Sequence, residues 1–415
     1  MSPNAGASPA LPLSGIRVLD LSRILAGPWA GQTLADLGAE VIKVEHPKAG
    51  DDTRSWGPPF VEDPESGDRG DAAYFFACNR GKKSITIDFT RPQGAALLHG
   101  IAAQSDVLLE NFKVGGLAKY GLDYAAMSAV NPRLVYCSIT GFGQTGPYAT
   151  RPGYDFLIQA MGGLMSITGE RDGRPGGGPQ KVGVAITDVM TGLYATIGVM
   201  AALRSRDVTG KGQHIDLALM DVQIAALANQ GASYLATGVA PVRMGNEHPS
   251  ISPYQSLPAS DGFFILATGN DSQYRNFCIT AGRPELADDA RFRTNSDRVG
   301  NRDVLTALLS DITRHRTIDE WTGAMEKAGV PCGPINSLDR VFADPHVRAR
   351  GVQLELDHPR YGAVPSVANP IRFSDTPIQY KSAPPVLGAN TRKILEGLLK
   401  KSGAEIDVLA QAGVI

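Results

Sequence analysis

Strand-like and helix-like segments alternate through the first 140 residues, and this alternation limits the possible folds more than any other feature. Strands that alternate with helices are typical of βαβ units with a parallel sheet. We therefore predict an α/β fold whose ligand crevice lies at the carboxyl ends of the strands. The apolar and β-branched runs predicted as strands are 16–21, 41–44, 84–88, 107–109 and 134–139, and the predicted helices are 28–37 and 92–103.

The chain has 415 residues, which is too long for one ordinary core and predicts two domains. The proline-rich stretch 243–256 predicts a linker or loop. A short strand at 262–267 and amphipathic helices at 303–312 and 318–328 follow it, before a final helix at 392–399. We predict the following division: 1–12, a disordered leader; 13–225 and 345–415, a large domain; 226–344, a small domain with linkers.

The charge balance argues against some partners. Forty basic and 42 acidic residues give a net charge of −2 without a basic stripe, so we expect no nucleic-acid partner. The N-terminus lacks the pattern of a secretory signal. The longest apolar run, 193–203, is too short to span a bilayer, so we expect no membrane association and a cytoplasmic location.

The histidines and cysteines show no metal-binding spacing, so no metal site is predicted. A glycine run at 141–146 matches GxGxxG, but Pro147 and a turn follow it instead of a helix, so no nucleotide cofactor is predicted. A P-loop is also missing, and we interpret Arg80, Lys82 and Lys83 as a solvated turn between strands.

Asp188 lies in the predicted first turn of an apolar helix, directly after a short apolar strand. The positive end of the helix dipole favours an ionised carboxylate there. An ionised aspartate that meets a substrate can act as a covalent nucleophile. Taken alone, however, the position is more typical of a helix cap.

Two further segments have the composition of ligand contacts. Glu110-Asn111-Phe112 ends a predicted strand, where a ligand could bind, although the residues alone favour an Asn turn with a packed Phe. The loop around Arg54 and Trp56 combines a guanidinium that can bind a carboxylate with a ring that can stack.

Taken together, these segments resemble the class III CoA-transferases, the family of formyl-CoA and carnitine CoA-transferases. The resemblance runs from about Leu13 to the C-terminus. It implies a Rossmann-like large domain, a smaller α+β domain, and ring-shaped subunits interlocked in a homodimer. It also implies that Asp188 is the nucleophile that accepts CoA from an acyl-CoA and passes it to a free acid. Its segments are 18–28, 37–45, 110–112, Asp188 with its helix, and 209–213.

The resemblance implies coenzyme A, bound as an acyl-CoA co-substrate, as the only cofactor. Positions matched to the family imply which residues bind it. These are Arg23, Ile24, Leu25, Ala26, His46, Ile87, Thr90, Asn111, Phe112, Lys119 and Tyr120.

The loop 247–255 lacks the glycine run of formyl-CoA transferases. Together with the Arg54–Trp56 segment and 329–336, it resembles the succinyl-CoA-dependent dicarboxylate transferases of the succinate–hydroxymethylglutarate type. This likeness implies succinyl-CoA as donor and a C4–C6 dicarboxylate such as glutarate as acceptor. The implied substrate contacts are Arg54, Trp56, Tyr154, Tyr254 and Gln255, with Arg54 on the distal carboxylate.

Two alternatives remain open. One is a racemase or isomerase of the α-methylacyl-CoA type. Tyr154 argues against it, because Tyr154 replaces the racemase histidine and a phenol is a poor base at neutral pH. The other is a non-catalytic acyl-CoA-binding protein, which would not require Asp188.

Overall fold

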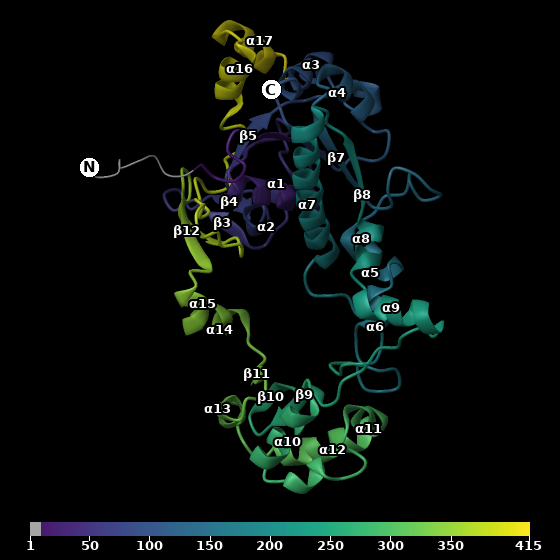
Figure 1. Cartoon of the computed structure of the whole chain (residues 1–415). Coiled ribbons are helices and arrows are strands. Elements are labelled where there is room, and N and C mark those ends of the chain that lie inside the picture. The colour runs from purple at the N-terminus through teal and green to yellow at the C-terminus, as the bar shows by residue number, and fades with distance from the viewer. Residues whose placement is uncertain (1–9) are drawn as a thin grey trace, which may run out of the picture. The chain divides into compact units, whose positions relative to one another are not determined.

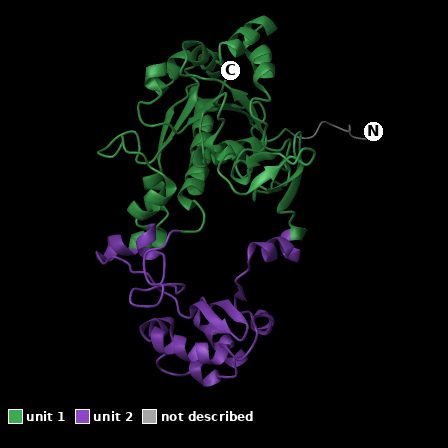
Figure 2. Ribbon diagram, turned by 180° about the vertical axis from the view of Figure 1, so that it is seen from behind, with its two compact units in different colours: residues 1–163, 182–232, 348–415 green, residues 164–181, 233–347 purple. Residues whose placement is uncertain are grey.

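The computed structural model describes residues 10–415, so the first nine residues of the predicted leader lie outside the described part. The chain forms two compact units (Figures 1 and 2). Unit 1 comprises residues 1–163, 182–232 and 348–415, and unit 2 comprises 164–181 and 233–347.

Unit 1 contains a six-stranded parallel sheet in the order β5-β2-β1-β6-β7-β8. The predicted mixed α/β class and parallel sheet are confirmed. The strands of the sheet are β1 (Arg17–Asp20), β2 (Glu40–Glu45), β5 (Lys82–Thr86), β6 (Val107–Glu110), β7 (Val135–Thr140) and β8 (His214–Ala218).

The other elements of unit 1 follow. The helices are α1 (Ala26–Asp36), α2 (Ala73–Phe76), α3 (Pro92–Ala102), α4 (Tyr124–Val130), α5 (Asp155–Met161), α7 (Ile186–Thr209), α8 (Leu219–Ala225), α16 (Thr391–Leu399) and α17 (Gly403–Gln411). The 3-10 helices are η1 (Asp52–Arg54) and η2 (Ala118–Tyr120), and the hairpins are β3 (Phe60–Glu62) with β4 (Arg69–Ala72) and β12 (Gln353–His358) with β13 (Gly362–Val367).

Helices cover both faces of the sheet. Because successive strand residues point to opposite faces, Val18 joins the core under α1 and α7, whereas Leu19 joins the core under α3, α4 and α16. Burial on both sides explains the apolar runs of the central strands β1, β6 and β7.

Helix α7 is the one described helix that is long and apolar enough, by length and composition, to cross a membrane. It packs against α1 and the sheet, and Ala195, Val199 and Ala202 are buried in that core. This packing accounts for the apolar side chains on the buried side of the helix.

Two sequence-based expectations about unit 1 are wrong. The segment before Asp188 is not a strand, because α7 begins at Ile186 after irregular backbone. The expected solvated turn is buried: Lys82 binds Asp20 at 3.0 Å with both side chains inaccessible, and Arg80 pairs with Asp36. Arg80 and Lys82 are therefore paired inside the fold, whereas Lys83 pairs with Glu40 and stays partly exposed, as expected.

Unit 2 packs helices against a small antiparallel sheet, β11-β10-β9. Strand β9 includes Pro258, which is tolerated because β9 is an edge strand. The strands are β9 (Tyr254–Ala259), β10 (Gly262–Ala267) and β11 (Cys332–Pro334). The helices are α6 (Leu164–Ile167), α10 (Asp271–Thr280), η3 (Pro284–Ala287), α11 (Asn295–Gly300), α12 (Arg302–Thr313), α13 (Ile318–Lys327) and α14 (Leu338–Ala343), while α9 (Ala228–Thr237) and α15 (Pro345–Ala349) cross the division.

Candidate active site

A cavity of about 460 Å³ lies in unit 1, bordered by segments that follow β1, β6 and β7. This is the carboxyl edge of the parallel sheet, where ligands bind in such folds. Asp188 lies in its wall. The predicted residues that line it are Arg23, Ile24, Leu25, Ala26, Thr90, Asn111, Phe112, Lys119, Tyr120, Tyr154 and Asp188.

Asp188 lies in the first turn of α7, as predicted, but it does not cap the helix. The N-cap is Ala185, which has no capping side chain. Asp155, at the start of α5, takes that role: its Oδ1 accepts hydrogen bonds from the backbone N–H groups of Thr187 at 2.8 Å and Asp188 at 3.3 Å. Gln159 Nε2 holds the other oxygen of Asp155 at 2.6 Å. The Asp188 carboxylate is therefore left available for a ligand.

The environment of Asp188 disfavours its charge. Burial and the nearby charge of Asp155 raise the pKa of Asp188 to about 7. The helix dipole is expected to favour the ionised carboxylate, but desolvation outweighs a dipole contribution of ~0.3–1 kcal/mol. Part of the population therefore stays protonated at neutral pH, and only the ionised form is nucleophilic.

Tyr74 on α2 lies close enough to Asp188 to sense its charge. Burial, followed by the charges of Asp188 and other groups, raises the pKa of Tyr74 to about 12. Its hydroxyl therefore stays protonated. The Tyr74 ring packs edge-on against Trp56 with centroids 5.6 Å apart, and neither ring belongs to the cavity wall.

Asn111 clamps the turn that follows β1. Its Oδ1 accepts from the Arg23 N–H at 2.9 Å, and its Nδ2 donates to the Arg23 carbonyl at 2.7 Å. The Arg23 guanidinium lies over the Phe112 ring and pairs with Asp52. The Glu110-Asn111-Phe112 segment therefore contacts the Arg23–Ala26 segment, and both line the cavity.

The cavity wall also carries positive charge that suits phosphate groups or carboxylates. Arg23, Lys113, Lys119 and Arg151 belong to it. Arg151 is exposed and its guanidinium stacks on Tyr148 at 4.0 Å. It forms no ion pair with any of the described residues.

Besides Trp56, three predicted site residues of unit 1 lie outside the cavity wall. His46 is exposed outside the cavity wall, and its ring nitrogen accepts from the backbone N–H groups of Lys48 and Ala49. Ile87 is 1% exposed and belongs to the core. Arg54 is buried: its guanidinium donates to Glu45 at 2.7 Å and 2.8 Å, to Asp71 at 2.8 Å and to the Pro385 carbonyl at 3.0 Å.

Tyr254 and Gln255 begin β9 in unit 2, which is not the unit that holds Asp188. Tyr254 is exposed and packs near His248. Gln255 is buried, and its Nε2 donates to Thr306 Oγ1 at 3.0 Å.

Sequence reasoning missed Asp155, Tyr74 and Arg151. Asp155 was visible only as part of the run Gly153-Tyr154-Asp155, and its pairing with the start of α7 depends on chain segments more than 30 residues apart. No sequence signal marks Tyr74, whose importance comes from where α2 places it. Arg151 lies in a turn that follows the glycine run and has no helical or strand periodicity.

Among residues 10–415, no group of three or more His, Cys, Asp or Glu side chains is placed to hold a metal ion.

Comparison with known proteins identifies the family. The model of CoA-transferase family III matches residues 13–391. The chain is 51% identical to a succinate–glutarate CoA-transferase of Agrobacterium fabrum, over 93% of this chain and 96% of that one. It is 43% identical to a mouse succinyl-CoA:glutarate CoA-transferase, over 100% of this chain and 92% of that one.

The solved structures agree. A CAIB/BAIF family protein from Brucella suis superposes with a TM-score of 0.83 and 54% identity, covering 94% of this chain and 100% of that chain. With the family model spanning nearly the whole chain, this protein belongs to CoA-transferase family III.

Proposed function

We propose that this enzyme transfers CoA from succinyl-CoA to glutarate, with Asp188 as the covalent carrier. One observation carries the proposal. The Asp188 carboxylate does not cap its helix, is partly desolvated, and lies in the wall of a cavity that also has four cationic side chains. The substrate pair comes from the two relatives, a succinate–glutarate CoA-transferase and a succinyl-CoA:glutarate CoA-transferase. They favour transfer over the racemase and the acyl-CoA-binding alternatives, because both relatives are transferases.

The first half of the reaction moves CoA onto the enzyme. The Asp188 carboxylate attacks the thioester carbonyl of succinyl-CoA, and the C–S bond breaks to give a mixed anhydride and CoA thiolate. The thiolate then attacks the Asp188 carbonyl, which forms an aspartyl-CoA thioester and releases succinate. Asp188 is half-buried in the cavity wall, and a bound acyl-CoA that fills the cavity would exclude water, which would otherwise hydrolyse these acyl intermediates.

The second half reverses these steps with the acceptor. The glutarate carboxylate attacks the aspartyl-CoA carbonyl and displaces CoA thiolate, which leaves a mixed anhydride of glutarate and Asp188. The thiolate attacks the glutaryl carbonyl, so glutaryl-CoA leaves and the Asp188 carboxylate is regenerated. One thioester is consumed and one is formed, so the energy of the thioester is conserved without another co-substrate.

For CoA recognition, we propose the predicted residues that line the cavity. Arg23 and Lys119 would meet phosphate groups, while Ile24, Leu25 and Phe112 would contact the apolar parts of the cofactor. His46 and Ile87 are not needed for this role, because they lie outside the cavity wall.

For the distal carboxylate of the acid, we propose Arg151 instead of Arg54. Arg54 already donates to Glu45, Asp71 and a backbone carbonyl, whereas Arg151 is exposed in the cavity wall without an ion pair among the described residues. Arg151→Gln should raise the KM for glutarate about tenfold or more, because a charge-assisted hydrogen bond is lost. The KM for a monocarboxylic acceptor of equal chain length should change little. Equal effects on both acids would contradict this assignment.

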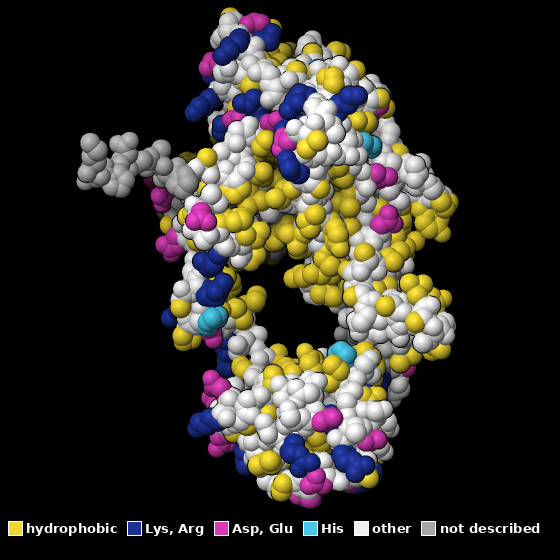
Figure 3. All heavy atoms as spheres, in the orientation of Figure 1, with side chains coloured by type: hydrophobic (Ala, Val, Ile, Leu, Met, Phe, Trp, Pro, Cys, Tyr) yellow, Lys and Arg dark blue, Asp and Glu magenta, His cyan; other side chains and the backbone are white. Residues whose placement is uncertain are grey.

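We further propose an interlocked homodimer of ring-shaped subunits, each with a large and a small domain, located in the cytoplasm. Apolar side chains gathered around α7 (Figure 3) support the assembly. All four cysteines are free thiols, as suits a reducing compartment.

The decisive experiment mixes purified protein with succinyl-CoA and measures the intact mass. The unsubstituted enzyme should gain a CoA adduct that hydroxylamine removes, and glutarate should convert the adduct to glutaryl-CoA. Asp188→Asn, which keeps the size of the side chain, should show neither adduct nor product. An adduct at another residue, or product formation by the Asn variant, would remove Asp188 from the mechanism.

A further inference from the structure

The turn between β1 and α1 contains a residue in an unusual backbone conformation. Ile24 has a φ of 72°, in the left-handed region, which is an outlier for a β-branched side chain. Ile24 also lines the cavity that holds Asp188. Residues held in such conformations persist only when the surrounding structure enforces them.

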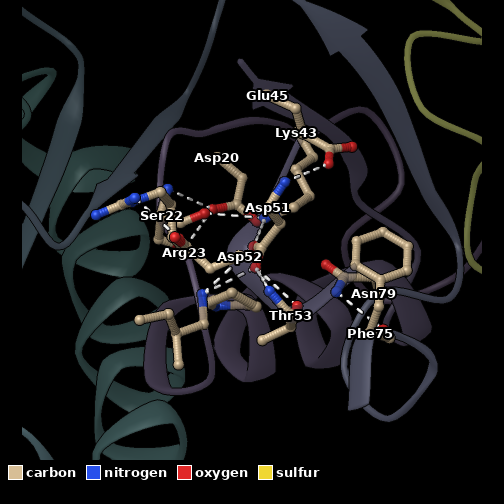
Figure 4. Close-up of polar contacts among 12 residues, drawn as sticks. Asp20, Ser22, Arg23, Lys43, Glu45, Asp51, Asp52, Thr53, Phe75 and Asn79 are labelled. Atoms are coloured by element: carbon tan, nitrogen blue, oxygen red, sulfur yellow. Dashed lines mark hydrogen bonds and ion pairs between the residues drawn. The ribbon is translucent and has the colours of Figure 1, made fainter. Parts of the chain in front are cut away.

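A buried ion pair enforces this one from both ends of the turn. Lys43 Nζ donates to the Ser22 carbonyl at 2.9 Å and binds Asp51 Oδ2 at 2.8 Å. The Asp51 carboxylate accepts from the Ile24 N–H, which lies 3.3 Å from each of its oxygens. Ser22 and Ile24 are therefore joined through one lysine and one aspartate. Figure 4 shows Ser22, Lys43 and Asp51 grouped together.

The charges of this pair are maintained by its neighbours. Burial would lower the pKa of Lys43, but Asp51, Asp20 and Glu45 raise it above its usual value. Burial would likewise raise the pKa of Asp51, but Lys43 and Thr53 lower it to about 2. Both side chains thus stay charged over the whole physiological pH range.

Stability alone does not explain the pair. Both side chains are 0% exposed, and an apolar pair of similar volume is often as stable as a buried ion pair or more so. An apolar pair, however, could bind neither the Ser22 carbonyl nor the Ile24 N–H. The charged pair therefore adds directional hydrogen bonds to the Ser22–Ile24 turn.

We propose that Lys43 and Asp51 are positioning residues for CoA binding: they hold the strained Ser22–Ile24 turn so that Ile24, Leu25 and Ala26 form the cavity wall beside Asp188. The inference rests on the proposed function, since it takes this cavity as the acyl-CoA site. Neither residue lines the cavity, so their effect is transmitted through the turn.

The first test uses Asp51→Asn, with Asp36→Asn as a matched control. Asp36 forms a comparably buried ion pair with Arg80, at the far end of α1 from Ile24. Asp51→Asn should weaken CoA binding about tenfold by calorimetry, because the turn relaxes from its strained form. Asp36→Asn should lower the free energy of unfolding in urea by a similar amount but leave the affinity for CoA unchanged. Equal affinity losses in the two variants would overturn the proposal.

A second substitution separates positioning from general damage. Glycine adopts left-handed backbone without strain, so in an Ile24→Gly background the turn depends less on Asp51. There, Asp51→Asn should weaken CoA binding less than about threefold. The same tenfold loss in both backgrounds would show that Asp51 does not act through the strain at Ile24.

Hydrogen exchange tests the pair without any ligand. Peptides that cover residues 20–28 should exchange faster in Asp51→Asn and remain unchanged in Asp36→Asn. If the unsubstituted protein bound no CoA, the proposed function would fail, yet the exchange measurement would still decide whether the pair holds the turn. Unchanged exchange in Asp51→Asn would overturn the proposal even if CoA transfer were established.

Discussion

Asp188 combines a nucleophilic role with an unfavourable environment. The carboxylate must be ionised to attack a thioester, yet burial and Asp155 raise its pKa to about 7. An elevated pKa makes a carboxylate a better nucleophile once it is ionised, because basicity and nucleophilicity rise together for the same type of atom. The same environment keeps a large fraction of the molecules protonated at neutral pH.

This balance predicts the pH dependence of the reaction. The value of kcat/KM should fall about tenfold per pH unit below pH 7 and level off above it, because only ionised Asp188 attacks. Asp155→Asn removes the neighbouring charge but keeps an oxygen that can accept from Thr187. The acid limb of the profile should therefore move to lower pH in that variant. Steady-state rates from pH 5 to 9 provide the measurement, and an unmoved limb would mean that Asp155 does not influence the titration of Asp188.

The same shift has a consequence for stability. The pKa of Asp188 is higher in the folded protein than in the unfolded chain, so the folded state binds more protons and loses stability as pH rises from about 4 to about 7. Asp188→Asn should therefore raise the free energy of unfolding by about 1–3 kcal/mol at pH 8 and leave it nearly unchanged at pH 4. Urea unfolding at the two pH values measures the difference. If the free energy of unfolding rose by the same amount at pH 4 and pH 8, the effect would come from packing and not from charge.

Sequence reasoning found Asp188 through a helix start and a family resemblance, but it could not foresee what surrounds it. Asp155 caps the start of α7 in place of Asp188, and Tyr74 lies close enough for its pKa to respond to the charge of Asp188. Both arrangements depend on segments that are far apart in the sequence. Arg54 illustrates the opposite case: a guanidinium in a Pro/Gly loop looked accessible, yet folding buries it against Glu45.

At the scale of elements, the crossing of α1 and α7 determines where Asp188 lies. Gly192 is one turn after Asp188, and a Cβ there would lie 2.6 Å from the Ala26 carbonyl oxygen and 3.0 Å from Trp29 Cβ. This close approach brings the helix with the nucleophile against the helix that begins at the cavity wall. The contact is between backbones, so it cannot be relieved by a rotamer change.

We therefore expect Gly192→Ala to push α7 away from α1. The variant should lose about 1–3 kcal/mol of stability through overpacking and lose transfer activity as well. Gly198→Ala on the same helix is the control, because its Cβ would meet Ile215 at an ordinary 3.5 Å. Alanine is also the better helix former, so this control should gain up to about 1 kcal/mol. Urea unfolding and transfer assays on both variants provide the measurement. Similar stability and activity in the two variants would mean that the close approach of α1 and α7 at Gly192 is not required.

The regular elements were predictable where burial on two faces leaves an apolar run. Strands β1, β2, β6 and β7 are of this kind and were located within one or two residues. Strand β8 was missed because only one of its five residues is buried, and its sequence therefore lacks that signature. Strand β9 was hidden by its proline, which only an edge position permits.

At the scale of the whole molecule, α7 presents an apolar face that unit 1 does not cover. Leu193, Tyr194, Ile197 and Met200 are 44%, 48%, 60% and 43% exposed, and they follow one another at helical spacing. The opposite side of the helix, with Ala195 and Val199, is buried. Exposed apolar side chains clustered in this way mark an interaction surface more often than a free one.

The proposed homodimer accounts for this face, and Ile197→Asp tests it. An aspartate charge in a desolvated interface would lack a partner, so it should prevent dimerisation. The variant should therefore sediment with the 43.9 kDa mass of one chain, and the unsubstituted protein with twice that mass. Val408→Asp is the control, because Val408 is 64% exposed on α17, a different helix of the same unit, and its substitution should leave the dimer intact. If the unsubstituted protein were monomeric, or if both variants dissociated alike, the α7 face would not be the interface, and its apolar side chains would need another partner.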